Sequence, residues 1–179
     1  LDFQGEEYQL DVDPALAAKW ESIRAKAQGK PIVGLNTGCG DRWTTRLWPE
    51  ERWTALITSL QAEGFFPIVL GGKQEDGLNT RYATNTGCYY PGHYSLKEFF
   101  AITANTDIVV TQVSMMMHIA IALRKRLVLF NNIFNAHEFH LYDRGAIVQP
   151  TSGCDCYYGN TCSRLSAFFT TTLPRSSTP

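Results

Sequence analysis

The chain has 179 residues, of which 44% are hydrophobic, and its 16 basic and 17 acidic side chains leave a formal charge of -1 at pH 7. This balance, without any run of lysine and arginine, excludes a surface built for nucleic acid or anionic lipid. The longest apolar runs, 65–70 and 127–130, fall far short of the ~20 residues that span a bilayer, and the first residues lack a secretory signal pattern. We therefore expect one ordinary domain with a cytoplasmic location.

The cysteines favour reduced thiols over a disulfide framework, because their number, five, is odd and two of them lie apart from the rest. A cluster near the end of the chain has Cys-x-Cys-x5-Cys spacing and offers three soft metal ligands, but no clear fourth ligand lies nearby. We therefore predict no metal and no cofactor. The separate pair is Cys39 and Cys88, and the cluster is Cys154, Cys156 and Cys162.

Residues 1–30 are predicted to be a connecting segment that carries one helix. Asp13 followed by Pro14 favours a helix start, because aspartate caps free amides and proline is tolerated at the first helical position. Gly29 is the expected end of this helix. Its apolar face consists of Leu16, Trp20, Ile23 and Ala27.

From residue 31 on, short apolar runs rich in β-branched residues alternate with longer amphipathic stretches. Nearly continuous apolar character is typical of parallel strands that are covered on both faces. The pattern predicts an α/β domain with a Rossmann-like, doubly wound parallel sheet over residues 31–162, followed by a poorly ordered tail at 163–179. The predicted strands are Pro31 to Leu35, Pro67 to Leu70, Ile108 to Thr111, Arg126 to Phe130 and Ala146 to Val148.

Three helices are predicted between these strands. The first begins at Pro49 and ends before Gly64. The second begins with a capping box made by Ser95 and Glu98, and the third begins near Ser114. Such alternation places ligand sites at the carboxyl ends of the strands.

The segment 36–40, Asn-Thr-Gly-Cys-Gly, directly follows the first predicted strand. Glycines such as Gly38 let the backbone approach a ligand, the next helix start offers amides, and Arg46 can hold phosphate through its planar guanidinium. Together with Thr37, these features suit a diphosphate. A tight turn with a solvated arginine fits the same residues equally well.

A second candidate segment is Gly71 and Gly72 followed by Glu75. An acidic residue that follows a pair of glycines can accept hydrogen bonds from ribose hydroxyls. A surface glutamate at a helix start is at least as compatible with these residues, because the helix dipole favours negative charge there.

Two further candidate segments precede helices. Tyr94 enters the second helix with Ser95 and Leu96, where an aromatic ring can cover a base or complete a core. The turn at 111–118 opens the third helix, so that Ser114, Met115 and the first amides can hold phosphate, with His118 one turn further on. A methionine-rich turn and a lone histidine are more often structural.

Several common catalytic patterns are missing from the sequence. There is no Walker loop and no G-x-S-x-G elbow, and the G-x-G-x-x-G pattern is incomplete, so kinase, hydrolase and NAD-dependent functions lose support. His137 and His140 are three residues apart rather than the four of the H-E-x-x-H zinc helix. We interpret residues 137–140 as a surface helix.

In their order and spacing, these segments resemble glycosyltransferase family 9, the ADP-heptose:lipopolysaccharide heptosyltransferases, from about Pro31 to Cys162. The family's basic residue two positions before Trp-Pro is matched by Arg46, and its acid four residues after a first glycine is matched by Glu75. Its Gly-x-x-Ser-Leu segment corresponds to residues 92–96, and its D-T-G-x-x-H-x-A turn to residues 113–120.

The resemblance implies one half of a GT-B type two-domain glycosyltransferase, in which this second domain binds the nucleotide-sugar donor and the first supplies the acceptor site and the catalytic base. It implies metal-free, inverting transfer from ADP-heptose to a lipopolysaccharide acceptor at the inner face of the bacterial inner membrane. We therefore expect the chain to bind nucleotide, to hold no catalytic residue and to transfer no sugar alone. The donor-binding residues implied are Thr37, Gly38, Arg46, Gly71, Gly72, Glu75, Tyr94, Ser95, Leu96, Ser114, Met115 and His118.

Three departures from the family pattern keep alternatives open. Val113 stands where the family usually has an aspartate that addresses the donor sugar, Met115 replaces a glycine, and residues 130–132 replace Phe-Gly-Pro. One alternative is another enzyme of the same architecture, either a transferase that uses a UDP-sugar or a non-hydrolysing epimerase. The other is a non-catalytic domain that kept the fold.

Overall fold

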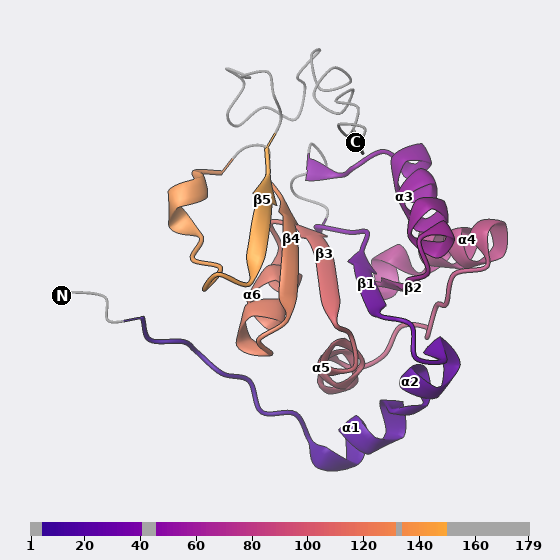
Figure 1. Ribbon diagram of the computed structural model, residues 1–179, viewed down its shortest axis with the longest axis horizontal. Coiled ribbons are helices and arrows are strands. Elements are labelled where there is room, and N and C mark those ends of the chain that lie inside the picture. Colours follow the sequence, from indigo (N-terminus) through magenta and orange to yellow (C-terminus); the bar gives the residue numbers. More distant parts are fainter. Residues whose placement is uncertain (1–4, 41–45, 132–133, 150–179) are drawn as a thin grey trace, which may run out of the picture.

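The computed structural model describes residues 5–40, 46–131 and 134–149, which form an alternating α/β chain. The strands β1, β2 and β3 are each followed by at least one α-helix, and β4 is followed by a 3-10 turn (Figure 1). The elements are α1 (Pro14–Trp20), α2 (Ser22–Ala27), β1 (Ile32–Asn36), α3 (Glu50–Ala62), β2 (Phe66–Leu70), the 3-10 turn η2 (Lys73–Glu75), α4 (Asp76–Thr86), α5 (Leu96–Ala104), β3 (Ile108–Gln112), α6 (Met115–Ala122), β4 (Arg126–Phe130), the 3-10 turn η3 (Ala136–Glu138) and β5 (Gly145–Val148).

The five described strands form one parallel sheet in the order β2-β1-β3-β4-β5. Asn36, the last residue of β1, lies in register with Leu70 of β2 on one side and with Thr111 of β3 on the other. The predicted Rossmann-like, doubly wound parallel sheet is therefore confirmed. The chain first places β2 on one side of β1 and then crosses over to place β3 on the other side. The direction of winding therefore reverses between β1 and β3, and their carboxyl ends form the topological switch point.

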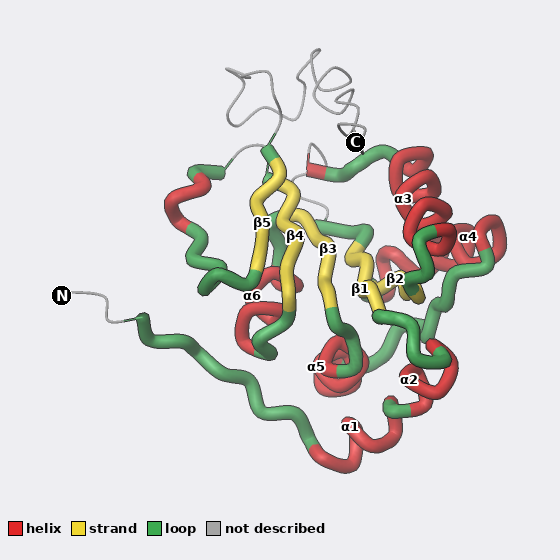
Figure 2. The backbone as a smooth tube through the Cα atoms, viewed as in Figure 1, coloured by secondary structure: helices red, strands yellow, loops and turns green. Residues whose placement is uncertain are grey.

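Helices cover both faces of the sheet, as continuous burial of the interior strand β1 requires (Figures 1 and 2). On one face, α1, α2, α5 and α6 contribute to a core that includes Ile32 and Val109. On the other face, α3 and α4 pack over a core that includes Val33, Val110 and Trp53. Alternate residues of each strand thus enter different cores.

The helix predicted from Pro14 onward is interrupted, so that the expectation of one helix is wrong. The N–H of Glu21 bonds to Ala18 rather than continuing the α-helical pattern, and α2 begins one residue later. The end of α2 is also earlier than predicted, because Gln28 adopts the left-handed conformation before Gly29 does. The predicted cap is confirmed, since the Asp13 carboxylate accepts bonds from two helix amides.

Three local predictions need correction. Residues 76–86 form α4, which was not predicted, because polar and small residues dilute its apolar face. The capping box at α5 is only half made: Ser95 accepts from the Glu98 N–H, while the Glu98 carboxylate pairs with Lys19. The surface helix predicted at 137–140 is instead the short turn η3.

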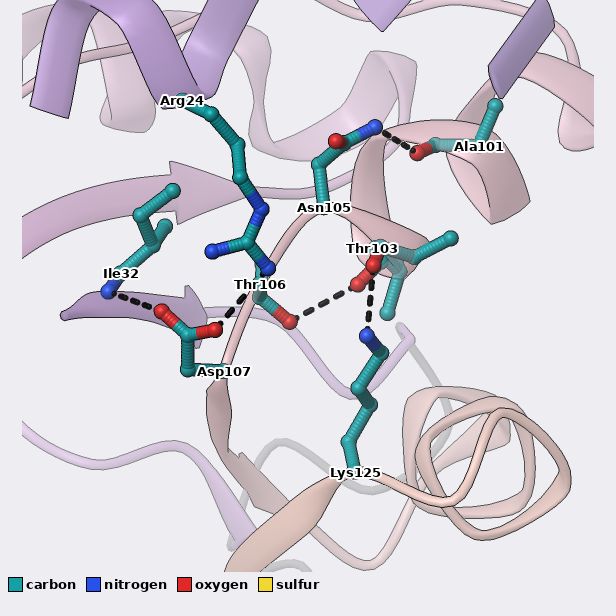
Figure 3. Close-up of polar contacts among 9 residues, drawn as sticks. Arg24, Ile32, Ala101, Thr103, Asn105, Thr106, Asp107 and Lys125 are labelled. Carbon is teal, nitrogen blue, oxygen red and sulfur yellow. Dashed lines mark hydrogen bonds and ion pairs between the residues drawn. The ribbon is translucent and has the colours of Figure 1, made fainter. Parts of the chain in front are cut away.

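A polar cluster closes the amino-terminal edge of the sheet (Figure 3). Asp107 accepts a 2.7 Å bond from the Ile32 N–H at the start of β1 and a 2.9 Å bond from Arg24 of α2. Burial favours a higher pKa for this carboxyl, but these bonds outweigh it and lower the pKa. Three further side chains of this edge, those of Asn105, Thr106 and Lys125, donate to backbone carbonyls of α5. We call the side chains of Arg24, Thr103, Asn105, Thr106, Asp107 and Lys125 the amino-edge cluster.

The segment before α1 runs as an extended strap beside the domain (Figure 2). Leu10 donates its N–H to the Ala122 carbonyl at the end of α6, and Arg144 makes two hydrogen bonds to the Glu7 carboxylate. These contacts tie residues that are far apart in the sequence, so that the predicted connecting segment is packed on the sheet domain.

Some predictions lie outside the described residues or concern features that the described part does not contain. The tail at 163–179 and the cluster of Cys154, Cys156 and Cys162 lie outside them. No helix in the described part of the chain is long and apolar enough to cross a membrane. Cys39 and Cys88 form no disulfide within the described residues, and the prediction of reduced thiols stays a prediction.

Candidate functional site

The carboxyl ends of β1 and β3 are joined by a network around Asn36. Its side-chain nitrogen lies 2.7 Å from the Gly38 carbonyl, 3.0 Å from Thr111 Oγ1 and 3.3 Å from Ser114 Oγ. Thr111 and Ser114 are themselves 3.1 Å apart through their hydroxyls. The loop after β1 and the turn after β3 are therefore held together at the switch point.

Arg46 bridges the same two segments from outside the sheet. Its guanidinium donates a 2.6 Å bond to the Val113 carbonyl and a 3.2 Å bond to the Cys39 carbonyl, and it stacks 5.4 Å from the ring centroid of Phe134. Burial lowers the pKa of Arg46, although a guanidinium stays charged in proteins. A positive charge is thus fixed between two backbone loops, and we call Asn36, Arg46, Thr111 and Ser114 the switch-point cluster.

The loops after β1 and β2 touch through Glu75. Its carboxylate accepts a 2.9 Å bond from the Gly72 N–H, and a Cβ on Gly38 would lie 2.0 Å from Glu75 Oε1. A Cβ on Gly71 would likewise meet Glu75 and Asn79 at 2.7 Å. Both glycines therefore permit contacts that no other residue allows without displacement of the carboxylate or its neighbours.

Thr37 lies in the same region and donates a 2.7 Å bond to Asn79 of α4. The neighbouring Asp76 carboxylate accepts bonds from Tyr90 at 2.7 Å and from His93 at 3.2 Å. These hydrogen bonds lower the pKa of Asp76, while burial and the bond to Asp76 raise the pKa of Tyr90. An anionic group thus accompanies Glu75 at the start of α4.

The amino terminus of α6 carries the other predicted phosphate contact. Ser114 is the N-cap, and its hydroxyl accepts a 3.3 Å bond from the Met116 N–H. Met115, at the first helical position, is exposed. A ligand phosphate at this helix end would replace or share the serine cap and lie beside the methionine side chain.

The structure places Tyr94, Ser95 and Leu96 at the start of α5, where their described contacts do not include the switch-point cluster. The Tyr94 ring packs edge-on against Trp20 of α1 at 4.9 Å, with the Lys19 ammonium 5.5 Å from its centroid. Leu96 is exposed, and Ser95 acts as the helix cap. A base-binding role for Tyr94 therefore stays a prediction, and its ring already has partners.

His118 lies on the exposed side of α6, where its ring nitrogen is 3.2 Å from the Tyr8 hydroxyl. Its described partner thus comes from the strap at 5–13 and not from the loops at the switch point. A contact of His118 with the donor stays a prediction.

Sequence reasoning missed four polar residues of this edge, namely Asn36, Asn79, Thr111 and Gln112. All four are buried, and Gln112 is only 2% exposed with neither amide atom bonded. Three of them, Asn36, Thr111 and Gln112, lie in the candidate segments 36–40 and 111–118, but the sequence gives their side chains no role. A polar side chain at the last position of a buried parallel strand is the signal that would have identified Asn36 and Gln112.

No metal site accompanies these groups in the part of the chain that the structure describes, where no three His, Cys, Asp or Glu side chains lie close enough to hold an ion. Burial raises the pKa of the Cys39 thiol, which favours its neutral form beside Arg46. The charges that face the loops are therefore the guanidinium of Arg46 and the carboxylates of Glu75 and Asp76.

A family model described as glycosyltransferase family 9 (heptosyltransferase) matches residues 1–139. The chain belongs to glycosyltransferase family 9. This match includes every candidate residue named above, from Thr37 to His118. No curated protein sequence matches the chain.

Solved structures of family 9 proteins share the fold. A glycosyl transferase family 9 protein from Veillonella parvula superposes with a TM-score of 0.69 at 15% identity, over 80% of this chain and 42% of its own. E. coli ADP-heptose lps heptosyltransferase II gives a TM-score of 0.66 at 19% identity, over 78% of this chain and 44% of its own. E. coli heptosyltransferase WaaC with ADP-2-deoxy-2-fluoro heptose gives 0.57 at 20% identity, over 68% and 37%. The chain thus spans less than half the length of these relatives.

Proposed function

We propose that the chain is the donor-binding half of a two-domain, GT-B type glycosyltransferase whose donor is an ADP-sugar, most simply ADP-heptose. Membership of family 9 supports the reaction class. Two structures similar in fold are described as complexes, one with ADP and one with an ADP-heptose analogue, and these support the choice of nucleotide. The acceptor we propose is a lipopolysaccharide core, reached at the cytoplasmic face of the inner membrane.

The observation that carries this proposal is the position of Arg46. Its guanidinium lies between the Cys39 and Val113 carbonyls, at the switch point where open α/β sheets bind ligands. Beside it begins α6, whose first amides carry a partial positive charge. A diphosphate between Gly38 and Ser114 would meet both sources of positive charge.

We place the ribose, the diphosphate and the base of the donor at successive segments along the carboxyl edge of the sheet. Glu75, fixed by the Gly72 N–H and pressed against Gly38, is placed to accept bonds from ribose hydroxyls on the β2 side. Thr37, tied to Asn79, stabilises the loop between ribose and diphosphate. The base then extends toward α4 and α5, where Tyr90, His93 and Tyr94 carry aromatic rings that would have to share or exchange their present partners.

In the proposed reaction an acceptor hydroxyl oxygen attacks the anomeric carbon while the bond to the diphosphate breaks, which inverts the configuration. The leaving diphosphate takes the electron pair, and Arg46 with the α6 amides stabilises its charge. A carboxylate of the other domain removes the hydroxyl proton. The chain by itself would bind the donor without transferring the sugar.

Calorimetric titration with ADP, UDP and GDP tests the donor assignment. We expect selective ADP binding that Arg46→Ala weakens by ~10-fold to 100-fold, the range for loss of a charged hydrogen bond. The matched control is Arg126→Ala, an exposed arginine at the amino-terminal end of β4, which should leave the affinity within about twofold. Equal affinity of the wild type and Arg46→Ala would show that Arg46 does not bind the diphosphate. Preference for UDP would show that the donor is a UDP-sugar and not an ADP-sugar.

A second candidate function is a non-catalytic domain that has lost the donor site. Arg46 favours this candidate, because its two terminal nitrogens already donate to backbone carbonyls. Ser114 supports it as well, since its hydroxyl is engaged by Asn36, Thr111 and Met116. Absence of binding for all three nucleotides would establish this candidate over the first.

A further inference from the structure

The orientation of the Asn36 side-chain amide is fixed by its neighbours. The Gly38 carbonyl, 2.7 Å away, can only accept a hydrogen bond, so the amide nitrogen must face it. The same nitrogen lies within reach of the Thr111 and Ser114 hydroxyls. The oxygen of the same amide takes no part in these three contacts.

This oxygen has no hydrogen-bond donor among the residues that the structure describes. Each bond of the Asn36 side chain uses its nitrogen. The residue is only 7% exposed, yet its oxygen is not among the fully sealed atoms that lack a partner. Asn36 Oδ1 is thus an acceptor on a largely buried side chain that the described residues do not use and that is not fully sealed from the surface.

The groups around this oxygen are of the opposite kind. Arg46 and the first amides of α6 are donors, suited to phosphate oxygens. The Val113 side chain offers no acceptor, because it is apolar and buried, and the Val113 carbonyl already accepts from Arg46. A ligand that places its diphosphate on these donors leaves Asn36 Oδ1 as the acceptor for a hydroxyl attached next to the diphosphate.

We propose that Asn36 is a specificity-determining residue whose Oδ1 accepts a hydrogen bond from a hydroxyl of the sugar on the donor's diphosphate. The inference rests on the proposed function and extends it to the sugar. Ribose is the less suitable source of the hydroxyl, since Glu75 already provides an acceptor on the β2 side of Gly38. The Asn36 side chain is instead held through its nitrogen beside Thr111 and Ser114 on the β3 side, next to the first amides of α6.

The experiment measures the ratio of the ADP dissociation constant to that of ADP-heptose, using the full 179-residue chain. Asn36→Ala should lower this ratio about fivefold, the effect of losing one hydrogen bond to the sugar. The matched variant is Thr111→Val, which removes a hydroxyl of the same network but keeps the Asn36 oxygen. It should weaken both ligands by the same factor and leave the ratio unchanged.

Each other result overturns the inference in a recognisable way. If Asn36→Ala weakens ADP and ADP-heptose equally, as Thr111→Val does, Asn36 only holds the loops together and the proposed function survives. If the wild type binds neither ligand, the proposed function fails and the role of Asn36 fails with it.

A measurement on the wild type covers the case in which Asn36→Ala does not fold. The side-chain amide resonances of Asn36, followed by nuclear magnetic resonance, should shift further with ADP-heptose than with ADP, because only the former places a hydroxyl on Oδ1. Identical shifts with the two ligands would overturn the proposal without any variant.

Discussion

The amino-terminal and carboxyl-terminal edges of the sheet differ in how fully their buried polar side chains are hydrogen-bonded. In the amino-edge cluster, Asp107 and its neighbours bond to one another and to backbone groups, and none of these side chains keeps a buried atom without a partner (Figure 3). At the carboxyl edge, Arg46 Nε, Asn79 Nδ2 and both amide atoms of Gln112 are buried without one. Both edges close the same strands, so burial alone does not explain the difference.

The difference supports the proposal that the carboxyl edge is the ligand-binding edge. Buried polar atoms without a hydrogen-bond partner lower stability, and they are rare in native structures unless they have a function. Gly38 and Gly71 add to the contrast, because a Cβ at either position would collide with Glu75. The amino-terminal edge therefore contributes stability, and the carboxyl edge gives up stability at the place where binding is proposed.

The largest change in stability is expected from a substitution in the amino-edge cluster. Asp107→Ala removes the acceptor of the Ile32 N–H and the partner of Arg24, and should lower the free energy of unfolding by about 2 kcal/mol, mainly because a backbone donor is left unpaired. Urea unfolding measures this change. Binding of ADP to the folded protein should remain the same, since no contact joins the amino-edge cluster to Arg46.

Asp11→Ala serves as the control, because Asp11 is an exposed carboxylate in the strap. Its expected effect is within about 0.5 kcal/mol. An equal loss in both variants would mean that general charge, and not the bond to Ile32, stabilises this edge.

A smaller change of opposite sign is expected at the carboxyl edge. Gln112→Met keeps the length of the side chain but removes two unbonded polar atoms, and should raise the free energy of unfolding by about 1 kcal/mol. Gln61→Met is the matched control, because Gln61 donates a 3.1 Å bond to the Thr86 carbonyl. It should lower stability instead. If both substitutions lower stability, Gln112 has a partner that the comparison of the two edges overlooks.

The parts of the fold that the sequence predicts are those set by local patterns. Strands were predictable because runs such as 126–130 are apolar and short, and the order of strands and helices left few possible topologies. The Asp13 cap and the cap at Ser114 follow from local chemistry and are confirmed. The helix α4 was missed because tertiary contacts of Asn79 and Tyr82, and not a strong apolar periodicity, hold it in place.

The site was harder to predict because its contacts connect residues distant in the chain. Arg46 was chosen for its charge, but its bond to Val113 spans 67 positions and follows only from the sheet order. Asn36 belongs to a loop motif in the sequence, while in the structure its amide joins β1 to β3 across 75 positions. His118 was placed by a motif at the site, while the structure pairs it with Tyr8.

The smallest effect sharpens the comparison by changing affinity more than stability. A Cβ at Gly38 would lie 2.0 Å from Glu75 Oε1, so Gly38→Ala must push the flexible carboxylate away from the Gly72 N–H. If Glu75 binds ribose as proposed, ADP affinity should fall about fivefold, as for loss of one hydrogen bond. The free energy of unfolding should change by less than about 1 kcal/mol, because a side-chain end moves and the core does not.

Gly77→Ala is the control for Gly38→Ala, since a Cβ at Gly77 meets no atom within 4 Å and the residue is helical. It should raise stability by about 0.5–1 kcal/mol through helix propensity and leave ADP binding unchanged. Calorimetric titration and urea unfolding of the two variants separate the effects. If Gly38→Ala lost stability without losing affinity, the contact between Gly38 and Glu75 would be structural, and the carboxyl edge would resemble the amino-terminal edge more closely than its unpaired atoms indicate.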